Sequence, residues 1–333
     1  MTRDVTFGLW YDFRNPEPWK RPFSRLYDDY LDQIAQAESQ GFGSVWLTEH
    51  HFCDDGYTPS PLVLAAAIGA RTKTMRIGTN LMILPLHNPI RIAEDAATLS
   101  LLTGGRFDLG VGIGYRDDEF RAFGRELKFR PSLMEEAIEI IRRAWDGRPI
   151  DFEGKRFSVG HQKISPQPET APRLLLGGMS EPAIDRAARI GDGFLSTGGI
   201  GQDMYVAALE RHGKQADGAI IAGHWAIIAP DPAAEAERVG PHVLYQANEY
   251  IRWGAFGPPE TTPLFPDAKA AIENGLYELW DADMAVDKLG ALLDAYPQIR
   301  DIHFWAQFPG EPLEQGQRRL DYIAEKVLPR LRA

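Results

Sequence analysis

Short apolar runs alternate with helix-like segments along almost the whole chain. This alternation is typical of a parallel sheet whose strands are joined by crossover helices. The expected strands are residues 5–10, 44–47, 75–81, 107–111, 173–176, 193–196, 220–228 and 301–305. The expected helices are residues 25–40, 61–72, 89–102, 131–145, 181–190, 203–212 and 314–331. Eight strands with intervening helices are what a closed (β/α)8 barrel needs, so the sequence predicts an α/β fold of the TIM-barrel type.

Two segments depart from this alternation of strands and helices and are expected to be insertions into a single barrel domain spanning 1–333. Residues 148–172 contain Asp151–Phe157, which reads as a β-hairpin with a glycine-containing turn. About 70 residues separate the last two expected strands, more than one crossover helix requires. Within them, residues 254–282 are rich in glycine, proline and aromatic residues, which favours an irregular loop that acts as a lid.

Composition narrows the class of protein. The chain has 333 residues, which one barrel with insertions can accommodate, and 44% of them are hydrophobic, enough for a large core. A net charge of −11 argues against binding nucleic acid or an anionic membrane surface. The single cysteine, Cys53, rules out a disulfide within the chain, and no signal-peptide pattern or membrane-length apolar run is present. These features predict a cytoplasmic enzyme.

The segment Glu49-His50-His51 follows the expected strand 44–47 and is the strongest candidate for chemistry. A neutral imidazole accepts a proton near pH 7, and an adjacent carboxylate can hold its tautomer. Because consecutive residues leaving a strand point in opposite directions, one histidine should face the barrel mouth and the other should pack outward. The alternative is that both histidines are structural. A metal site is not expected, because no Cys/His spacing typical of zinc is present.

Glycines mark two further candidate regions. Gly110, Gly112 and Gly114 alternate along one strand and leave room either for a flat ligand or for close packing inside the barrel. The run Gly177-Gly178-Met179-Ser180 lies between an expected strand and helix. Free amides at that helix N-terminus would suit a phosphate, although a tight turn explains the same glycines.

Taken together, these segments resemble the bacterial luciferase-like family of flavin-dependent monooxygenases. The matching residues cover roughly positions 5 to 200 and comprise Gly41-Phe42, Glu49-His50-His51-Phe52, Ile77-Gly78-Thr79, Leu84-Pro85, Asn88-Pro89, Glu94, Gly104-Gly105-Arg106-Phe107, Gly110-Val111-Gly112, Glu119-Phe120, Phe123-Gly124, Gly177-Gly178 and Arg186–Gly193. The resemblance implies a barrel that binds reduced FMN from a separate NAD(P)H:flavin reductase. It also implies reaction with O2 through a C4a-(hydro)peroxyflavin to oxygenate a small, largely apolar substrate.

The resemblance also assigns residues to roles. It makes His50 the catalytic residue, supported by Glu49 and His51, and places a non-prolyl cis peptide bond in the segment Thr79-Asn80-Leu81. The remaining expected cofactor contacts are Gly112, Gly114, Arg116, Gly177, Gly178, Met179 and Ser180, with Arg116 as a phosphate partner. Trp10, Tyr11, Trp305 and Phe308 are expected to wall the substrate pocket.

Two other functions remain open at this stage. One is a deazaflavin F420-dependent oxidoreductase, which would transfer hydride without O2. The other is a non-catalytic flavin-binding protein. In either case, small residues on the helices around Leu64–Ala70 and Ala93–Ala97, together with the resemblance, predict a homodimer.

Overall fold

A computed structural model describes residues 4–332 and confirms the expected (β/α)8 barrel. Eight parallel strands pair in chain order, and the barrel closes where the last strand pairs with the first. These strands are β1 (Thr6–Tyr11), β2 (Ser44–Leu47), β3 (Arg76–Thr79), β5 (Phe107–Gly112), β8 (Arg173–Gly177), β9 (Gly193–Thr197), β10 (Ile220–His224) and β13 (Ile299–Trp305). Nearly all of their residues are buried, as expected for strands covered on both faces.

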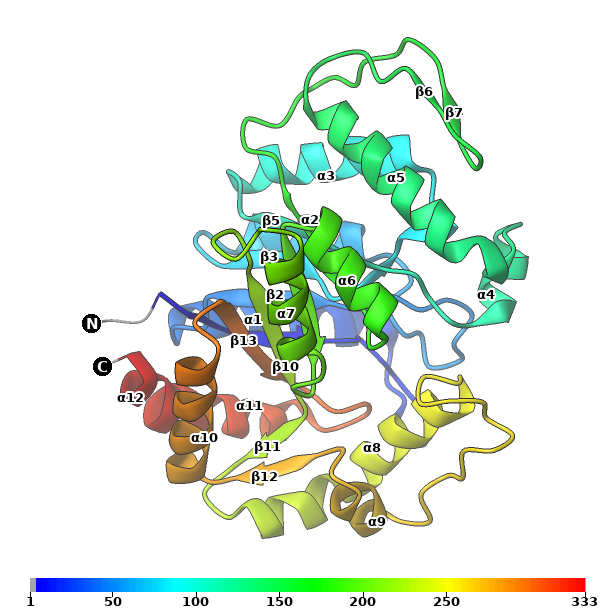
Figure 1. The fold of residues 1–333 in the computed structure, drawn as a ribbon. Coiled ribbons are helices and arrows are strands. Elements are labelled where there is room, and N and C mark those ends of the chain that lie inside the picture. The colour runs from blue at the N-terminus through cyan, green and yellow to red at the C-terminus, as the bar shows by residue number, and fades with distance from the viewer. Residues whose placement is uncertain (1–3, 333) are drawn as a thin grey trace.

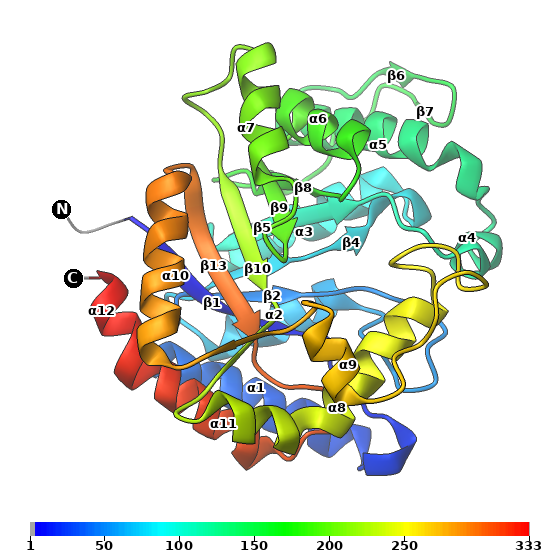
Figure 2. The ribbon, with the colours of Figure 1, turned by 60° about the horizontal axis from the view of Figure 1, so that its bottom comes forward.

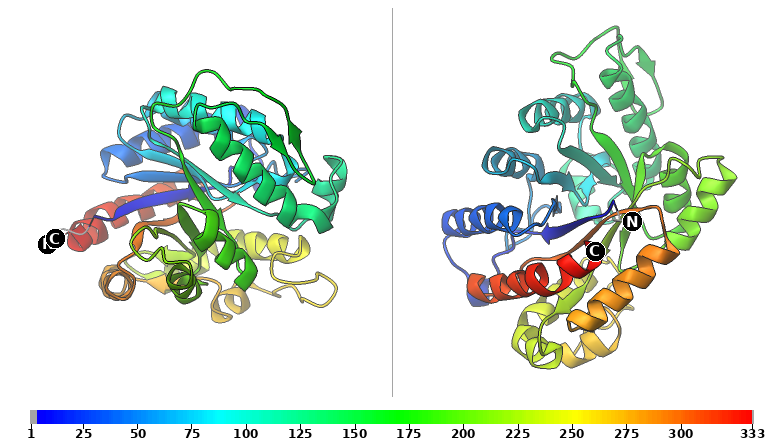
Figure 3. Two further views of the ribbon diagram at one scale, coloured as in Figure 1. Left: turned by 45° about the horizontal axis from the view of Figure 1, so that its top comes forward. Right: turned by 90° about the vertical axis from the view of Figure 1, so that its left-hand side faces the viewer.

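Helices surround the strands as an outer ring (Figures 1 and 2). They are α1 (Phe23–Ser39), α2 (Pro61–Arg71), α3 (Pro89–Thr103), α5 (Arg130–Trp145), α6 (Glu181–Ile190), α7 (Gln202–Arg211), α10 (Ala282–Ala295) and α11 (Leu313–Tyr322). The last helix continues through a π-helical turn (Ile323–Val327) into α12 (Leu328–Arg332). As a result, α12 lies beside β1, where the guanidinium of Arg332 lies 6.0 Å from the centre of the Phe7 ring (Figure 3).

Local sequence explains why α3 begins and ends where it does. The side chain of Asn88 accepts hydrogen bonds from the amides of Ile90 and Arg91, and Pro89 occupies the first helical position, where no amide hydrogen is needed. Gly104 ends the helix with φ +63°, a left-handed conformation that glycine adopts without a Cβ clash.

Charged residues occupy the amino-terminal ends of three strands. Asp108 on β5 accepts hydrogen bonds from Arg76 on β3 and Arg173 on β8, each bidentate with shortest distances of 2.6 Å. Two guanidinium groups on one buried carboxylate tie these strands together at that end of the barrel. The carboxyl ends of the strands remain for the functional site.

The segment expected as one strand over 220–228 is two strands in the structure. The chain leaves the barrel after His224, and β11 (Ala226–Ile228) pairs with β12 (Glu278–Trp280) in a separate two-stranded sheet. Between them lie α8 (Pro232–Arg252) and α9 (Ala268–Glu273), which Figure 2 shows beside one end of the barrel. The 254–282 region is therefore partly helical and partly strand rather than wholly irregular.

Smaller elements complete the fold. The expected hairpin within 148–172 is present as β6 (Phe152–Glu153) and β7 (Ser158–Val159), which pair antiparallel. A short strand β4 (Met82–Ile83) extends the pairing along β5, and α4 (Asp117–Ala122) follows it. No helix within residues 4–332 is long and apolar enough to cross a membrane.

Candidate active site

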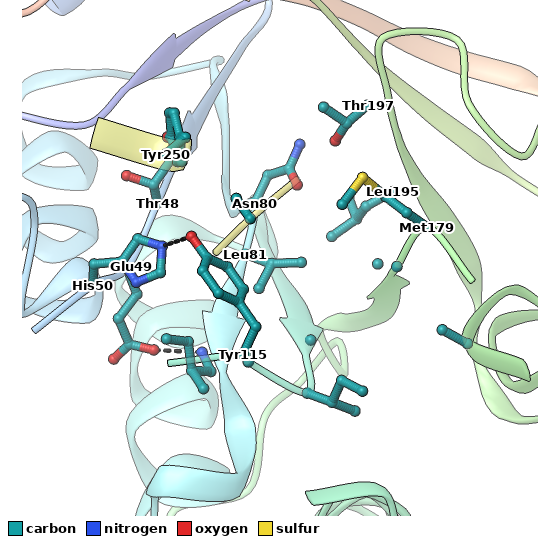
Figure 4. A pocket seen from close by; sticks show the side chains of 18 of the residues that line it. Thr48, Glu49, His50, Asn80, Leu81, Tyr115, Met179, Leu195, Thr197 and Tyr250 are labelled. Atoms are coloured by element: carbon teal, nitrogen blue, oxygen red, sulfur yellow. Dashed lines mark hydrogen bonds between the residues drawn. The ribbon is translucent and has the colours of Figure 1, made fainter. Parts of the chain in front are cut away.

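A cavity of about 390 Å³ opens at the carboxyl ends of the barrel strands, where TIM barrels place their active sites. Its wall includes residues at the ends of β1, β2, β3, β5, β8, β9 and β10 or in the loops that follow them, together with residues of α5 and α8 (Figure 4). Those among them named from the sequence are Trp10, Glu49, His50, Asn80, Leu81, Gly112, Gly114, Gly177, Gly178, Met179 and Ser180. The volume lies within the range of small-molecule sites.

His50 reaches this cavity with both ring nitrogens hydrogen-bonded. Its Nδ1 lies 2.9 Å from Oε1 of Glu119, and its Nε2 lies 2.9 Å from the hydroxyl of Tyr115. Glu119 is fully buried, and the same oxygen accepts from the amide of His51 and from Arg116. Figure 4 shows the His50 and Tyr115 side chains facing each other at the wall of the cavity.

These contacts define the proton positions. A carboxylate oxygen that already receives two N–H donors acts as an acceptor, so the Nδ1 of His50 carries its hydrogen. In the neutral ring, Nε2 then carries a lone pair, which accepts a hydrogen bond from the hydroxyl of Tyr115. Burial, with the nearby Tyr250 and Glu119, raises the pKa of Tyr115 well above its ordinary value, so this hydroxyl stays protonated at neutral pH. His50 is thus a pre-oriented base coupled to a hydroxyl at the cavity wall.

Glu49 does not support His50, contrary to the expectation from the sequence. Its Oε1 lies 3.2 Å from Nε2 of His51 and 2.8 Å from Nε2 of His87, and its Oε2 accepts the amide of Ile83. Glu119, which lies 69 residues from His50 in the chain, occupies the supporting position instead. Only the folded barrel brings these two residues together, although Glu119-Phe120 was part of the family-like sequence.

His51 points away from the cavity, as expected for one of two consecutive histidines. It packs against Phe123 and shares the Glu49 carboxylate with His87. The ligand atoms of Glu49, His51 and His87 lie within 4.8 Å of one another, a cluster that could hold a metal ion although no metal site is expected from the sequence. Burial raises the pKa of Glu49, but the charge of His87 and the histidine hydrogen bonds outweigh it and lower that pKa to about 2.

The peptide bond between Asn80 and Leu81 is cis, as the resemblance predicted for this segment. The Leu81 side chain occupies the space beside two glycines, because a Cβ at Gly112 or Gly177 would lie 2.6 Å from Leu81 methyl carbons. Gly110 instead admits the carbonyl oxygen of Thr79, which a Cβ there would meet at 1.8 Å. The alternating glycines therefore serve close packing as well as the cavity. Thr79 itself lies outside the cavity wall and bonds to Gly110.

An anion cradle lies on the opposite side of the cavity from His50. The turn Gly177-Gly178 leads into α6, which begins directly after Ser180. The Ser180 side chain makes no capping hydrogen bond to the helix. Gly178 fits closely, since a Cβ there would lie 2.5 Å from that of Ala183. Arg130 also lines the cavity and forms no ion pair with any described residue. A helix N-terminus with a free guanidinium beside it suits a phosphate group.

Arg116 does not line the cavity, which corrects its expected role as phosphate partner. Its guanidinium donates to the carbonyl of His51 and to Glu119 and Asp118, and contacts the thiol of Cys53. It therefore holds the loop that carries His50. Arg130 is the one lysine or arginine among the described residues of the cavity wall, and no sequence pattern indicates it because it begins α5, far in the chain from the glycine turn.

Aromatic side chains form a large part of the wall, but only one of the four expected aromatic residues belongs to it. Trp10 lines the cavity, and Trp305 stacks behind it at 4.4 Å. Tyr11 turns outward to hydrogen-bond Gln33, and Phe308 is buried against Tyr277. The aromatic wall residues missed from the sequence are Tyr57, Tyr115, Trp225, Tyr250 and Phe256. Most lie on loops or on α8, where no periodic pattern reveals which side chain faces a ligand.

Comparisons with known proteins agree with this arrangement. Residues 6–287 match the family described as luciferase-like monooxygenase. An F420-dependent glucose-6-phosphate dehydrogenase of Amycolatopsis mediterranei is 33% identical over 188 residues, which are 54% of this chain and 56% of that protein. The enzyme of the same name from Nakamurella multipartita is 29% identical over 92% of this chain and 93% of its own length. The chain thus spans about half the length of the first relative and nearly all of the second.

Solved structures share the fold. The oxygenating constituent of the 3,6-diketocamphane monooxygenase from Pseudomonas putida, a type II Baeyer–Villiger monooxygenase solved with FMN, superposes with a TM-score of 0.78 at 22% identity, covering 98% of both chains. At that identity the likeness supports the architecture alone. Because the family match covers most of the chain and the barrel places its residues at one cavity, this protein belongs to the luciferase-like monooxygenase family of oxidoreductases.

Proposed function

We propose that the cavity binds reduced FMN, delivered by a separate reductase, and that the protein uses it with O2 to oxygenate a small, largely apolar substrate. Reduced FMN, when bound, supplies the electrons that activate O2. The observation that carries the proposal is the chain Glu119–His50–Tyr115, which ends in an aromatic cavity opposite an anion cradle.

The residues fit an FMN-sized ligand with a phosphate at one end. Ser180, the N-terminus of α6 and Arg130 would hold the phosphate. Tyr57, Trp225, Tyr250 and Phe256 surround the rest of the cavity with apolar ring surface. Such walls exclude water, which would otherwise cause the oxidant derived from O2 to decay before it oxygenates a substrate.

Side chains of this protein are placed to hold and transfer a proton at the cavity wall. Glu119 keeps the hydrogen of His50 on Nδ1, so that Nε2 can accept a proton from, or return one to, an oxygen in the cavity. Tyr115 extends this path, because its hydroxyl donates to Nε2 while its oxygen can accept from a group in the cavity. A positioned acid–base group of this kind contributes about 10²- to 10⁴-fold to a rate.

An F420-dependent oxidoreductase is the second candidate. The curated relatives carry that name, and one further observation favours it. A cleft of about 270 Å³, lined by Lys128, Arg130 and Arg186, adjoins the cradle at Ser180. F420 extends beyond its phosphate into an acidic tail, which such a cleft would suit. A sugar phosphate substrate is disfavoured, because Arg130 is the one lysine or arginine among the described residues of the cavity wall.

An anaerobic titration separates the two candidates. The protein is titrated in parallel with photoreduced FMN and with reduced F420, and the bound form is then mixed with O2 and a panel of apolar ketones, aldehydes and alkenes. The proposal expects tight binding of reduced FMN and a product that carries oxygen from ¹⁸O2. Preference for F420 with reduction of a substrate under anaerobic conditions would overturn it in favour of the second candidate. Binding of either cofactor with no turnover of any panel member would revive the non-catalytic alternative.

A further inference from the structure

A chain of buried hydrogen bonds runs from the barrel core to the cavity wall and ends at Asn80. Oδ1 of Asp301 accepts from Nε1 of Trp46 at 3.0 Å and lies 3.1 Å from Nδ1 of His303. Nε2 of His303 lies 3.0 Å from Nδ2 of Asn80. All four side chains are buried, and none of these bonds has a part in the proton path through His50.

The chain has one consistent set of donors and acceptors. Oδ1 of Asp301 receives the indole N–H of Trp46, so it is an acceptor and Nδ1 of His303 must carry the hydrogen. Burial lowers the pKa of His303 more than Asp301 raises it, so the ring is neutral near pH 7. Its Nε2 therefore carries no hydrogen and has a free lone pair. That lone pair accepts from the amide NH2 of Asn80, which fixes the side-chain amide in one of its two orientations.

The fixed orientation leaves the amide oxygen of Asn80 free. No described residue donates to Oδ1, and Asn80 lines the cavity, where Figure 4 shows its amide between Tyr115 and Thr197. The backbone is fixed as well, since Nε1 of Trp10 donates to the Asn80 carbonyl at 3.0 Å. The cavity wall therefore presents a rigid hydrogen-bond acceptor at this point, whereas a flipped amide would present a donor.

From this geometry we infer that Asn80 is a specificity residue that selects the reduced cofactor, with Asp301 and His303 as its positioning residues. The inference rests on the proposed function. Reduced FMN, when bound, would present an N–H group at a central ring position where oxidised FMN has a nitrogen lone pair, and Oδ1 of Asn80 would accept from it. A fixed acceptor stabilises that N–H and repels the lone pair of the oxidised ring. A deazaflavin has carbon at the same ring position and gains no N–H there.

Binding constants test the inference without turnover. Dissociation constants are measured anaerobically for photoreduced FMN and for oxidised FMN, using the wild type and Asn80→Leu, which keeps the branched shape of the side chain but removes the acceptor. The expected result is a five- to tenfold fall in the preference for reduced over oxidised FMN, the size of one lost hydrogen bond. A tenfold fall equals a shift of about 30 mV in the two-electron potential of bound FMN.

Two controls make the result specific. The affinity for reduced 5-deaza-FMN should be the same in wild type and Asn80→Leu, because that ligand lacks the N–H. Thr197→Val, which removes a polar group elsewhere on the same wall, should change both FMN affinities by equal factors. Equal weakening of reduced and oxidised FMN by Asn80→Leu would overturn the inference, whereas failure of the wild type to bind either form would instead overturn the proposed function.

A second measurement covers the positioning residues and needs no ligand. In ¹⁵N-histidine-labelled wild type, His303 should show a protonated Nδ1 and an unprotonated Nε2 near pH 7. The opposite tautomer would turn the Asn80 amide around and contradict the inference. If Asn80→Leu fails to fold, Asn80→Ala removes the same acceptor and gives the same comparison.

Discussion

At the scale of single residues, the proposed function depends on His50 being held between Glu119 and Tyr115. Tyr115→Phe removes one hydroxyl and keeps the ring that contacts His50. We expect coupled oxygenation to fall at least tenfold, with reduced FMN binding within about twofold of wild type, because the lost group moves a proton rather than holds the ligand. Product formation and H2O2 release measured together test this, since uncoupled O2 consumption should rise as product falls. Unchanged coupling in Tyr115→Phe would exclude the hydroxyl from the proton path.

His87 provides a prediction about stability and pH. Burial lowers its pKa, but the Glu49 charge outweighs burial and raises it above the ordinary value. A raised histidine pKa contributes stability that is complete below about pH 6.5 and is lost as pH rises through the raised value. His87→Gln should therefore lower the free energy of unfolding by about 1–3 kcal/mol at pH 6 and by less at pH 9. Urea unfolding at the two pH values measures the difference.

His161 offers the matched control for that measurement. Its ring lies 2.6 Å from Asp151 on the surface and is 75% exposed. Solvent screens such a pair, so His161→Gln should leave the unfolding free energy nearly unchanged at both pH values. An equal effect of His87→Gln at pH 6 and pH 9 would contradict a charged His87 in the folded state.

At the scale of elements, the turn from β8 into α6 should determine phosphate binding. Gly178→Ala would push a Cβ against Ala183 and displace the first turn of α6. We expect affinity for FMN to fall about tenfold, while affinity for riboflavin, which lacks the phosphate, stays the same. Gly160→Ala is the control, because a Cβ at Gly160 meets no atom within 4 Å. Equal loss of FMN and riboflavin affinity would show that the cradle does not hold the phosphate.

The elements also show what the sequence can and cannot reveal. The barrel strands and helices can be predicted from apolar runs and from the residues that begin and end them, such as Asn88, Pro89 and Gly104 at the ends of α3. The break after His224 could not be read, because the apolar run continues into β11 while the chain changes sheets. Glu119 as the partner of His50 was likewise hidden, since long-range pairing depends on how strands assemble rather than on local spacing.

At the scale of the whole molecule, the homodimer expected from the sequence remains a prediction. Small residues such as Ala65 and Ala93 are fully buried, so they serve packing within the chain. Val63 on α2 and Leu102 on α3 are 71% and 68% exposed and offer apolar surface on two helices that pack against each other. Light scattering should give twice the monomer mass for the wild type and the monomer mass for Val63→Glu with Leu102→Glu. Leu264→Glu, at an exposed site on another segment, should remain dimeric.

The proposed function requires one cavity to hold the cofactor between the N-terminus of α6 and the pair His50–Tyr115. A crystal structure of the protein soaked anaerobically with reduced FMN tests this most directly. We expect electron density for the phosphate at Ser180 and Arg130, with the ring system within reach of Tyr115 and Asn80. Density for FMN elsewhere on the chain, or an orientation that places the phosphate beside His50, would contradict it.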